Sequence, residues 1–160
     1  MAVREVLLYP DPALKQVALP AQADQAERVG NDLMDTMRAF PGCVGLAAPQ
    51  LGELVRVVVI DLTGHRRVPD PSGPLVLINP RVRQAHGTEV AREGCLSIPE
   101  LTANVRRATE IEVEHAGGRL HTTGFEARCV LHELDHLDGI LFLDRVESLS
   151  EDLFRRKTRE

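Results

Sequence analysis

The residues best suited to chemistry gather in one short stretch, CVLHELDHLDG, at residues 129–139. His132 and His136 stand four positions apart, which on a helix is slightly more than one turn, so both side chains would leave the same face. Glu133 follows the first histidine and completes the pattern H-E-x-x-H. On a helix this pattern lets two imidazoles hold one metal ion while the unligated glutamate moves protons at the water bound to that ion. A surface helix rich in charge is the alternative interpretation.

A catalytic metal site usually has a third protein ligand and keeps one position open. Cys129 lies on the same predicted helix, where a buried free cysteine more often serves as a small hydrophobic residue. Cys95 lies in the sequence EGCLS, in a segment that is typical of an extended strand, and a strand beside the helix could present its thiolate to the ion. The candidates on both sides of the motif are Cys95, Cys129, Asp138, Asp144 and Glu147.

The helices that would position these residues can be predicted from the spacing of apolar residues. Apolar side chains recur every four positions within residues 23–40, which is typical of an amphipathic helix. A second helix over residues 125–139 carries the H-E-x-x-H pattern and is closed by Gly139. The sequence SLSE at residues 148–151 predicts a capping box that opens a short final helix.

The strands are predicted by β-branched and alternating residues. Buried strands are expected at residues 55–62 and 75–80, which are rich in valine, isoleucine and leucine. Polar and apolar residues alternate over residues 110–123, which predicts a hairpin with a tight turn at Gly117 and Gly118. Strands followed by the motif helix favour an α+β fold, with a largely antiparallel sheet wrapped against one central helix.

Length and charge narrow the function classes. A chain of 160 residues fits one domain, which we expect to span residues 1–160. The net charge of −5 argues against a protein that binds duplex nucleic acid. The three cysteines suggest no disulfide framework, and the N-terminus has no apolar run of signal-peptide length. We therefore expect a cytoplasmic protein with reduced thiols and no membrane partner. The basic C-terminal run FRRKTRE is expected to be a solvated tail.

Three segments together resemble the peptide deformylase family. They are GLAAPQ at residues 45–50, EGCLS at residues 93–97 and HELDH at residues 132–136, in the order and with the gaps of the family. Flanking segments such as LVLINP and LFLDRV extend the resemblance over the whole chain. The resemblance implies a peptide-deformylase-like fold in which antiparallel sheets surround the metal-binding helix.

The resemblance also implies an activity and a set of roles. The family removes the N-formyl group from the initiator methionine of nascent polypeptides and releases formate. A metal-activated water attacks the formyl carbon, with Glu133 as the general acid and base. The implied metal ligands are Cys95, His132 and His136. The side-chain amide of Gln50 and the backbone N–H of Leu96 are implied to bind the developing oxyanion.

Cofactor and partners follow from the same resemblance. It implies one divalent metal ion, with Fe²⁺ expected as the native ion and Zn²⁺, Ni²⁺ or Co²⁺ as alternatives. The implied partners are N-formylmethionyl nascent peptides, with the ribosome as a candidate place of encounter.

Further residues match family positions that surround the reaction site. Val44, Gly45, Phe125 and Cys129 are implied to bind the methionine of the substrate. Arg128 falls at or near a position of the same set, and it fits an apolar pocket only if its charged head points out to solvent along its stem. Glu93 and Arg107 align with a family pair that braces the metal loop, with an ordinary surface ion pair as the alternative.

Two positions depart from the common family pattern. Cys43 replaces a glycine and would be strained if its backbone needed a positive φ angle. Leu131 replaces a glutamine next to His132, about 100° away from the ligand face of the helix. We expect loss of an outer hydrogen bond there rather than loss of activity.

Two other functions compete with deformylation. A zinc peptidase of the H-E-x-x-H type would take a downstream histidine or glutamate as its third ligand and leave Cys95 dispensable. A degenerate homologue would bind formylated chains without cleaving them and would be expected to have lost Glu133 or Gln50, but both residues are present.

Overall fold

A computed structural model describes residues 2–156 of the chain. Helix α1, Ala23–Ala39, buries the apolar stripe that includes Val29, Leu33 and Met37, which confirms the predicted amphipathic helix. It ends at Ala39 because Phe40 takes an extended backbone conformation. None of the helices in the described part of the chain is long and apolar enough to span a membrane.

The first sheet lies between the two long helices. Its strands are β1, Gly45–Ala47, β2, Val57–Ile60, and β3, Leu75–Ile78, and they pair in the order β1-β2-β3 with antiparallel register. All four residues of β2 are fully buried. Val57 and Val59 pack with α1, whereas Val58 and Ile60 pack with the motif helix. Burial on both faces explains why this strand is a continuous apolar run.

The second sheet contains the predicted hairpin. Strands β7, Glu110–His115, and β8, Gly118–Thr123, pair with β4, Arg81–His86, in the order β4-β7-β8. The hairpin is confirmed, but the position of its turn was wrong by one residue. His115 pairs with Gly118, so Ala116 and Gly117 form the turn, and Gly118 supplies the positive φ angle of 130°.

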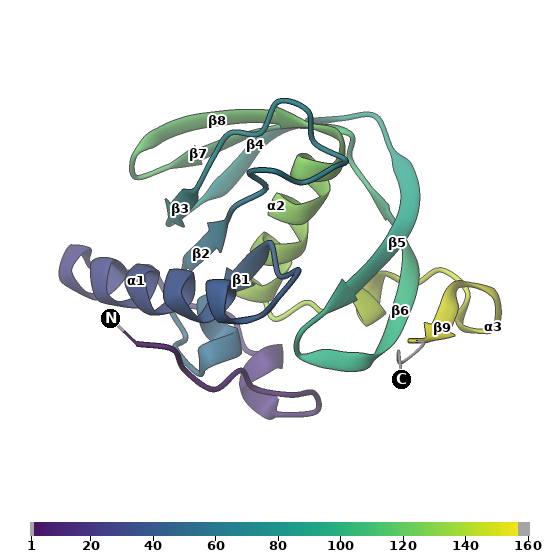
Figure 1. The fold of residues 1–160 in the computed structure, drawn as a ribbon, viewed down its shortest axis with the longest axis horizontal. Helices are drawn as coiled ribbons and strands as arrows, with labels where there is room; N and C mark the ends of the chain where they lie inside the picture. Colours follow the sequence, from purple (N-terminus) through teal and green to yellow (C-terminus); the bar gives the residue numbers. More distant parts are fainter. Residues whose placement is uncertain (1, 157–160) are drawn as a thin grey trace.

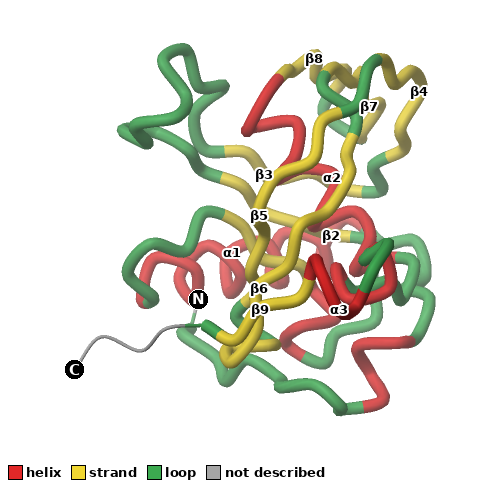
Figure 2. The backbone as a smooth tube through the Cα atoms, turned by 90° about the vertical axis from the view of Figure 1, so that its right-hand side faces the viewer, coloured by secondary structure: helices red, strands yellow, loops and turns green. Residues whose placement is uncertain are grey.

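The third sheet carries the cysteine segment. Its strands are β5, Glu89–Cys95, β6, Ile98–Arg107, and β9, Leu153–Arg155, in the order β5-β6-β9, and Figure 2 shows them side by side. The extended segment predicted around Cys95 reverses direction, because Cys95 pairs with Ile98 across a two-residue turn. The prediction of a solvated C-terminal tail was wrong for Phe154 and Arg155, which belong to β9 and pair with β6; residues 157–160 lie outside the described part.

Helix α2, Gly124–Leu137, lies at the centre of the molecule, with β7 and β8 above it and β5 and β6 to its right in Figure 1. The predicted α+β fold with antiparallel sheets around the motif helix is therefore confirmed. Gly139 follows the helix with a φ angle of 72°. A Cβ atom at this position would lie 2.6 Å from the backbone oxygen of Lys15, so only glycine fits there.

Short elements complete the fold. The 3-10 helices are η1, Pro12–Lys15, η2, Ala48–Leu51, and η3, Phe142–Arg145, and the last helix is α3, Leu149–Asp152. The final helix is therefore confirmed, but the capping box predicted for it was wrong. The Ser148 side chain makes no capping hydrogen bond and instead contacts the hydroxyl of Ser150 at 3.3 Å.

Candidate active site

The structure brings Cys95, His132 and His136 together. One ligand atom of each lies within 4.8 Å of the others, and all three residues are buried. Helix α2 aims the two imidazoles to one side, and Cys95 ends strand β5 directly before the hairpin turn. Within residues 2–156 this is the only group of histidine, cysteine and carboxylate side chains placed to hold a metal ion.

The carboxylates weighed as alternative ligands are engaged elsewhere. Asp144 pairs with Lys15, Asp138 pairs with Arg56, and Glu147 pairs with Arg106. Each pair lies outside the ligand cluster, so an H-E-x-x-H peptidase site with a downstream acidic ligand is not formed. Cys129 also stays outside the cluster, although it is buried in the adjoining pocket wall.

Glu93 orients the first histidine. Its carboxylate lies 2.9 Å from Nδ1 of His132, which leaves Nε2 to face the site. Arg107 donates to both carboxylate oxygens of Glu93, at 2.8 and 2.9 Å. Burial alone would raise the pKa of Glu93, but its partners Arg107 and His132 hold that pKa well below its usual range. The Glu93–Arg107 pair is buried and contacts a ligand, unlike an ordinary surface ion pair.

Arg128 does not meet the condition under which it would fit an apolar pocket. Its guanidinium does not reach solvent but donates to Glu93 Oε2 at 2.7 Å and to two backbone carbonyl oxygens, those of Val105 and Glu89. The residue is only 5% exposed. A buried carboxylate needs compensating charge, and Glu93 takes it from two arginines instead of one.

Sequence reasoning missed Asp135. This residue accepts hydrogen bonds from Arg107, at 2.5 Å, and from Arg145, at 2.5 and 2.8 Å. It therefore links Arg107, which holds Glu93 against His132, to Arg145 of the short helix η3. Its position three residues after His132 on the same helix is the one sequence signal that points to this role.

Glu133 stands beside the ligands without joining them. Its side chain is buried, and burial raises its pKa to about 7. Its Oε1 atom has no hydrogen-bond partner within the described residues. Gly45 packs against it so closely that a Cβ atom there would lie 2.7 Å from Oε2. A buried carboxylate with one unbonded oxygen is suited to accept and return a proton.

The charges of the cluster fit a cation. Burial lowers the pKa of His136, and so does the neighbouring His132. Burial would also lower the pKa of His132, but hydrogen bonds with Cys95 and Glu93 outweigh it and raise that pKa well above the usual value. A divalent ion would take the place of that proton among the same donors. A thiolate with two imidazoles is a donor set for a transition metal.

Gln50 and the hairpin turn form the opposite wall. The Gln50 side-chain oxygen accepts from the Ala47 N–H at 3.0 Å, which fixes its amide nitrogen toward Ser97 Oγ at 3.1 Å and Cys95 Sγ at 3.5 Å. Leu96 occupies the turn between β5 and β6 and lines the same pocket. The N-terminal segment holds both walls, because Leu7 and Tyr9 donate backbone hydrogen bonds to Gln50 and Ser97.

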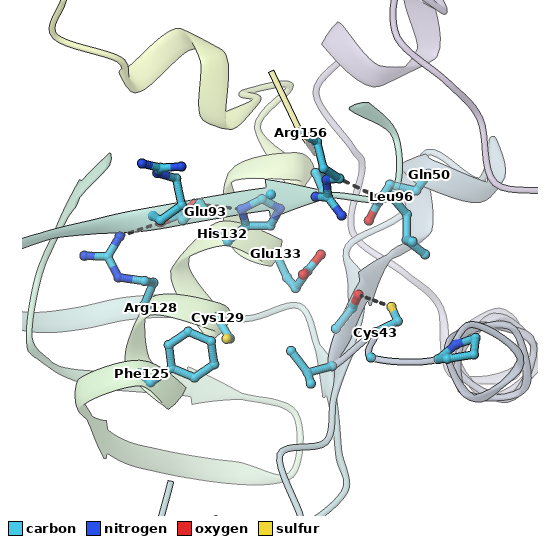
Figure 3. Close-up of a pocket in the computed structure, with 17 residues that line it drawn as sticks. Cys43, Gln50, Glu93, Leu96, Phe125, Arg128, Cys129, His132, Glu133 and Arg156 are labelled. Carbon is cyan, nitrogen blue, oxygen red and sulfur yellow. Dashed lines mark hydrogen bonds and ion pairs between the residues drawn. The ribbon is translucent and has the colours of Figure 1, made fainter. Parts of the chain in front are cut away.

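A cavity of about 280 Å³ leads to the cluster, with the labelled side chains of Figure 3 on its walls. The four residues predicted to bind methionine all line it: Val44, Gly45, Phe125 and Cys129. It also has lining residues that sequence reasoning missed: Pro41, Gly42, Arg92, Gly94 and Arg156. These residues come from loops and strand edges, where no local pattern marks a pocket.

The two departures from the family pattern are accommodated. The only residue other than glycine with a positive φ angle in the described chain is Asn79, so Cys43 is not strained. Its thiol donates to the Gly45 carbonyl at 3.2 Å, and burial raises its pKa to about 12. Leu131, on α2 itself, is partly buried against the hydrophobic core and is not part of the pocket wall.

Comparison with known proteins gives a consistent result. The family model described as polypeptide deformylase matches residues 3–152. A peptide deformylase of Alkalilimnicola ehrlichii is 43% identical over 98% of this chain and 89% of its own length. A peptide deformylase structure from Legionella pneumophila is 35% identical, with a TM-score of 0.82 over 92% of this chain and 88% of its own.

A further solved structure carries a peptide. It is a class I type b peptide deformylase from Acinetobacter baumannii with Met-Ala-Ser bound, 32% identical, with a TM-score of 0.78 over 91% of this chain and the whole of its own. The fold, the Cys-His-His cluster and these similarities agree along the chain. The chain therefore belongs to the polypeptide deformylase family.

Proposed function

We propose that the chain hydrolyses the N-formyl group of methionine at the start of new polypeptides and releases formate. Membership of the polypeptide deformylase family gives it peptide deformylase activity. The observation that carries the proposal is the convergence of Cys95, His132 and His136 beside the unligated Glu133, at the end of a pocket. The pocket gives a formylated chain end a route to the cluster.

Cys95, His132 and His136 are the residues that would hold the metal ion. When bound, a divalent ion there would supply a Lewis acid and lower the pKa of a water molecule. We propose Fe²⁺ as the native ion, with Zn²⁺, Ni²⁺ or Co²⁺ able to replace it. The support is the donor set, since sulfur and imidazole nitrogen suit each of these ions.

Glu133 would move the proton. Its carboxylate would accept a proton from water and return it to the amine nitrogen as the formyl group leaves, because an amide nitrogen is a poor leaving group without a general acid. Its Oε1 atom, which has no hydrogen-bond partner in the described part of the chain, supports this role. The Gln50 amide and the Leu96 backbone N–H would stabilise the oxyanion, each donor typically contributing about 3 kcal/mol.

The substrate would lie as an extended chain between two sheet edges. Strands β1 and β5 are each at the edge of their sheet, and both contribute residues to the pocket. Edge strands offer unpaired backbone groups to an added peptide. The methionine side chain would then enter between Val44, Phe125 and Cys129. Support comes from the similar Acinetobacter baumannii structure with Met-Ala-Ser bound.

We also propose that the chain works in the cytoplasm and meets its substrates at the ribosome. The support is the chemistry of the substrate, because a formylated methionine starts a nascent chain there. Residues 1–160 are proposed to act as a single domain.

Formate release tests the proposed function. Protein prepared without oxygen is given formyl-Met-Ala-Ser or acetyl-Met-Ala-Ser, and the metal content is measured on the same sample. We expect formate from the first peptide and little acetate from the second. Cleavage between residues without formate would favour the zinc peptidase, and tight binding without any product would favour the degenerate homologue.

A further inference from the structure

Two arginines at the rim of the pocket are not used by the proposed chemistry. Arg92 on β5 and Arg156 just after β9 both line the pocket and both are exposed. Neither pairs with a carboxylate within residues 2–156, whereas the buried pocket arginine, Arg128, is committed to Glu93. Figure 3 draws Arg156 among the side chains that line the pocket. The mouth of the pocket therefore carries positive charge, although the chain as a whole has a net charge of −5.

Arg92 is held in place by its neighbours. Its guanidinium stacks on the Phe154 ring, 3.6 Å from the centroid. It also donates to Asn104 Oδ1 at 3.2 Å and to Thr102 Oγ1 at 3.3 Å. These bonds leave further N–H donors free. A guanidinium that is already oriented loses less conformational entropy when it binds an anion.

Arg156 sits on the backbone next to the metal ligand. A Cβ atom at Gly94 would lie 2.1 Å from its Nη2 atom, so the glycine before Cys95 makes room for the guanidinium. The Arg156 backbone N–H donates to the Glu100 carbonyl at 2.7 Å, which anchors the residue beyond the end of β9. The positive group is thus within one residue of Cys95 along β5.

We propose that Arg92 and Arg156 select formylated chains with aspartate or glutamate at the second or third position. This inference rests on the proposed function. An extended chain rises about 3.4 Å per residue, so a substrate along β5 carries its next residues from Cys95 past Gly94 toward Arg92. The guanidinium fork matches a carboxylate and can bind both of its oxygens. A lysine at the same substrate positions is disfavoured by the same charges.

Isosteric peptides test this selection. Formyl-Met-Glu-Ala-Ser amide is compared with its glutamine counterpart, and formyl-Met-Ala-Glu-Ser amide with the corresponding glutamine peptide. The C-terminal amide removes the other carboxylate, and free-acid versions measure its separate contribution. We expect kcat/KM to be about three- to ten-fold higher for glutamate in at least one pair at low salt, and the ratio to shrink above about 0.5 M salt.

Variants separate the two arginines from general charge effects. R92Q and R156Q should each reduce the glutamate-to-glutamine ratio, and the double variant should bring it near one. R155Q is the matched control, because Arg155 is the neighbouring residue on β9 but does not line the pocket. It should keep the wild-type ratio. Should the double variant fail to fold, the wild-type protein still tests the selection. A glutamate-to-glutamine ratio that does not shrink at high salt would then contradict it.

Two results would overturn the selection: equal kcat/KM for the glutamate and glutamine peptides in wild type, or an unchanged ratio in R92Q and R156Q. If no peptide releases formate, the proposed function fails on its own. The affinities of the same peptides for the Glu133→Gln protein, measured by calorimetry, then still decide whether the rim recognises a carboxylate.

Discussion

At the scale of single residues, the site separates holding a metal from moving a proton. Cys95, His132 and His136 converge, whereas Glu133 stays beside them with one oxygen that has no hydrogen-bond partner among residues 2–156. Burial raises the pKa of Glu133 to about 7, and a general acid and base works best with a pKa near the working pH. The two tasks can therefore be tested by different substitutions.

Glu133→Gln should lower kcat by about 100-fold or more, because positioned proton transfer typically contributes 10²–10⁴-fold. The amide keeps the size of the side chain, so metal content and peptide affinity should change little. His132→Ala should instead lose the metal. Stopped assays of formate and metal analysis on the same samples measure both. Near-normal turnover in Glu133→Gln would assign the proton transfer to another group.

Cys95 should be the thiol most sensitive to oxygen when the site holds iron. Burial raises the pKa of Cys43 to about 12 and that of Cys129 further still, so both stay protonated and unreactive near neutral pH. A ligand thiolate beside oxidising iron is expected to move toward sulfenic and sulfinic acid. Mass spectrometry of air-exposed protein should find added oxygen first on the Cys95 peptide, together with loss of activity and metal.

The nickel form is the control for this oxidation. Nickel(II) does not readily enter the same one-electron chemistry, so its activity should decay more slowly in air. Equal decay of the iron and nickel forms would reject the explanation, as would oxidation that falls first on Cys43 or Cys129.

At the scale of elements, the close approach of β1 to α2 fixes the position of Glu133. Gly45→Ala adds a Cβ atom that would lie 2.7 Å from Glu133 Oε2 and 3.1 Å from two carbons of the same side chain. Because Glu133 is buried, it has little room to move. We expect kcat to fall by about 10-fold or more, since misplacement by about 1 Å can reduce rates 10²-fold.

Metal content should be unchanged in Gly45→Ala, because the ligands lie on α2 and β5. Gly117→Ala, in the exposed turn between β7 and β8, is the matched control and should keep full activity. Wild-type kcat in Gly45→Ala would mean that the Glu133 carboxylate is not confined by β1.

The N-terminal segment is tied to α1 and to the loop after η2 by Arg4. Its guanidinium lies 3.3 Å from Asp32 and 3.0 Å from Glu53. Burial would raise the pKa of Glu53, but hydrogen bonds from Arg28 and Arg4 outweigh it and hold that pKa below its usual value. A lowered carboxyl pKa stabilises the fold above the unfolded-state pKa, and the stabilisation is lost as the pH falls through the folded-state pKa.

Arg4→Gln should therefore reduce the free energy of unfolding by about 1 kcal/mol at pH 7. The difference from wild type should shrink as the pH falls below the unfolded-state glutamate pKa of about 4.3 and through the lower folded-state pKa of Glu53. Urea unfolding of both proteins at several pH values measures this difference in the free energy of unfolding. A difference that stays constant from pH 7 to pH 3 would show that Glu53 is not the partner.

At the scale of the whole molecule, periodic patterns gave the main elements and short motifs gave the site. Helix α1, the buried strand β2 and the hairpin of β7 and β8 follow from local apolar spacing. The ligand set follows from resemblance, because nothing near Cys95 in the sequence says that it approaches His132. The outer strands β4 and β5 are largely exposed, so they carry no apolar run that would predict them.

Contacts between residues far apart in the chain explain which features could not be predicted from the sequence. Asp135 and Arg128 are charged residues on the motif helix, and only their arrangement around Glu93 and Arg107 shows that they are buried support. Strand β9 looked like a solvated basic tail because its pairing with β6 joins residues far apart in the chain. The same pairing brings Arg156 to the pocket. These features depend on topology rather than on local pattern.

The most direct measurement is a titration of metal-free protein with ferrous or nickel ion without oxygen, following formate release from formyl-Met-Ala-Ser. Activity should rise in proportion to added metal and stop at one ion per chain. Cys95→Ala should neither bind the ion tightly nor release formate. Full activity of the metal-free protein, or of Cys95→Ala, would contradict a deformylase centred on Cys95, His132 and His136.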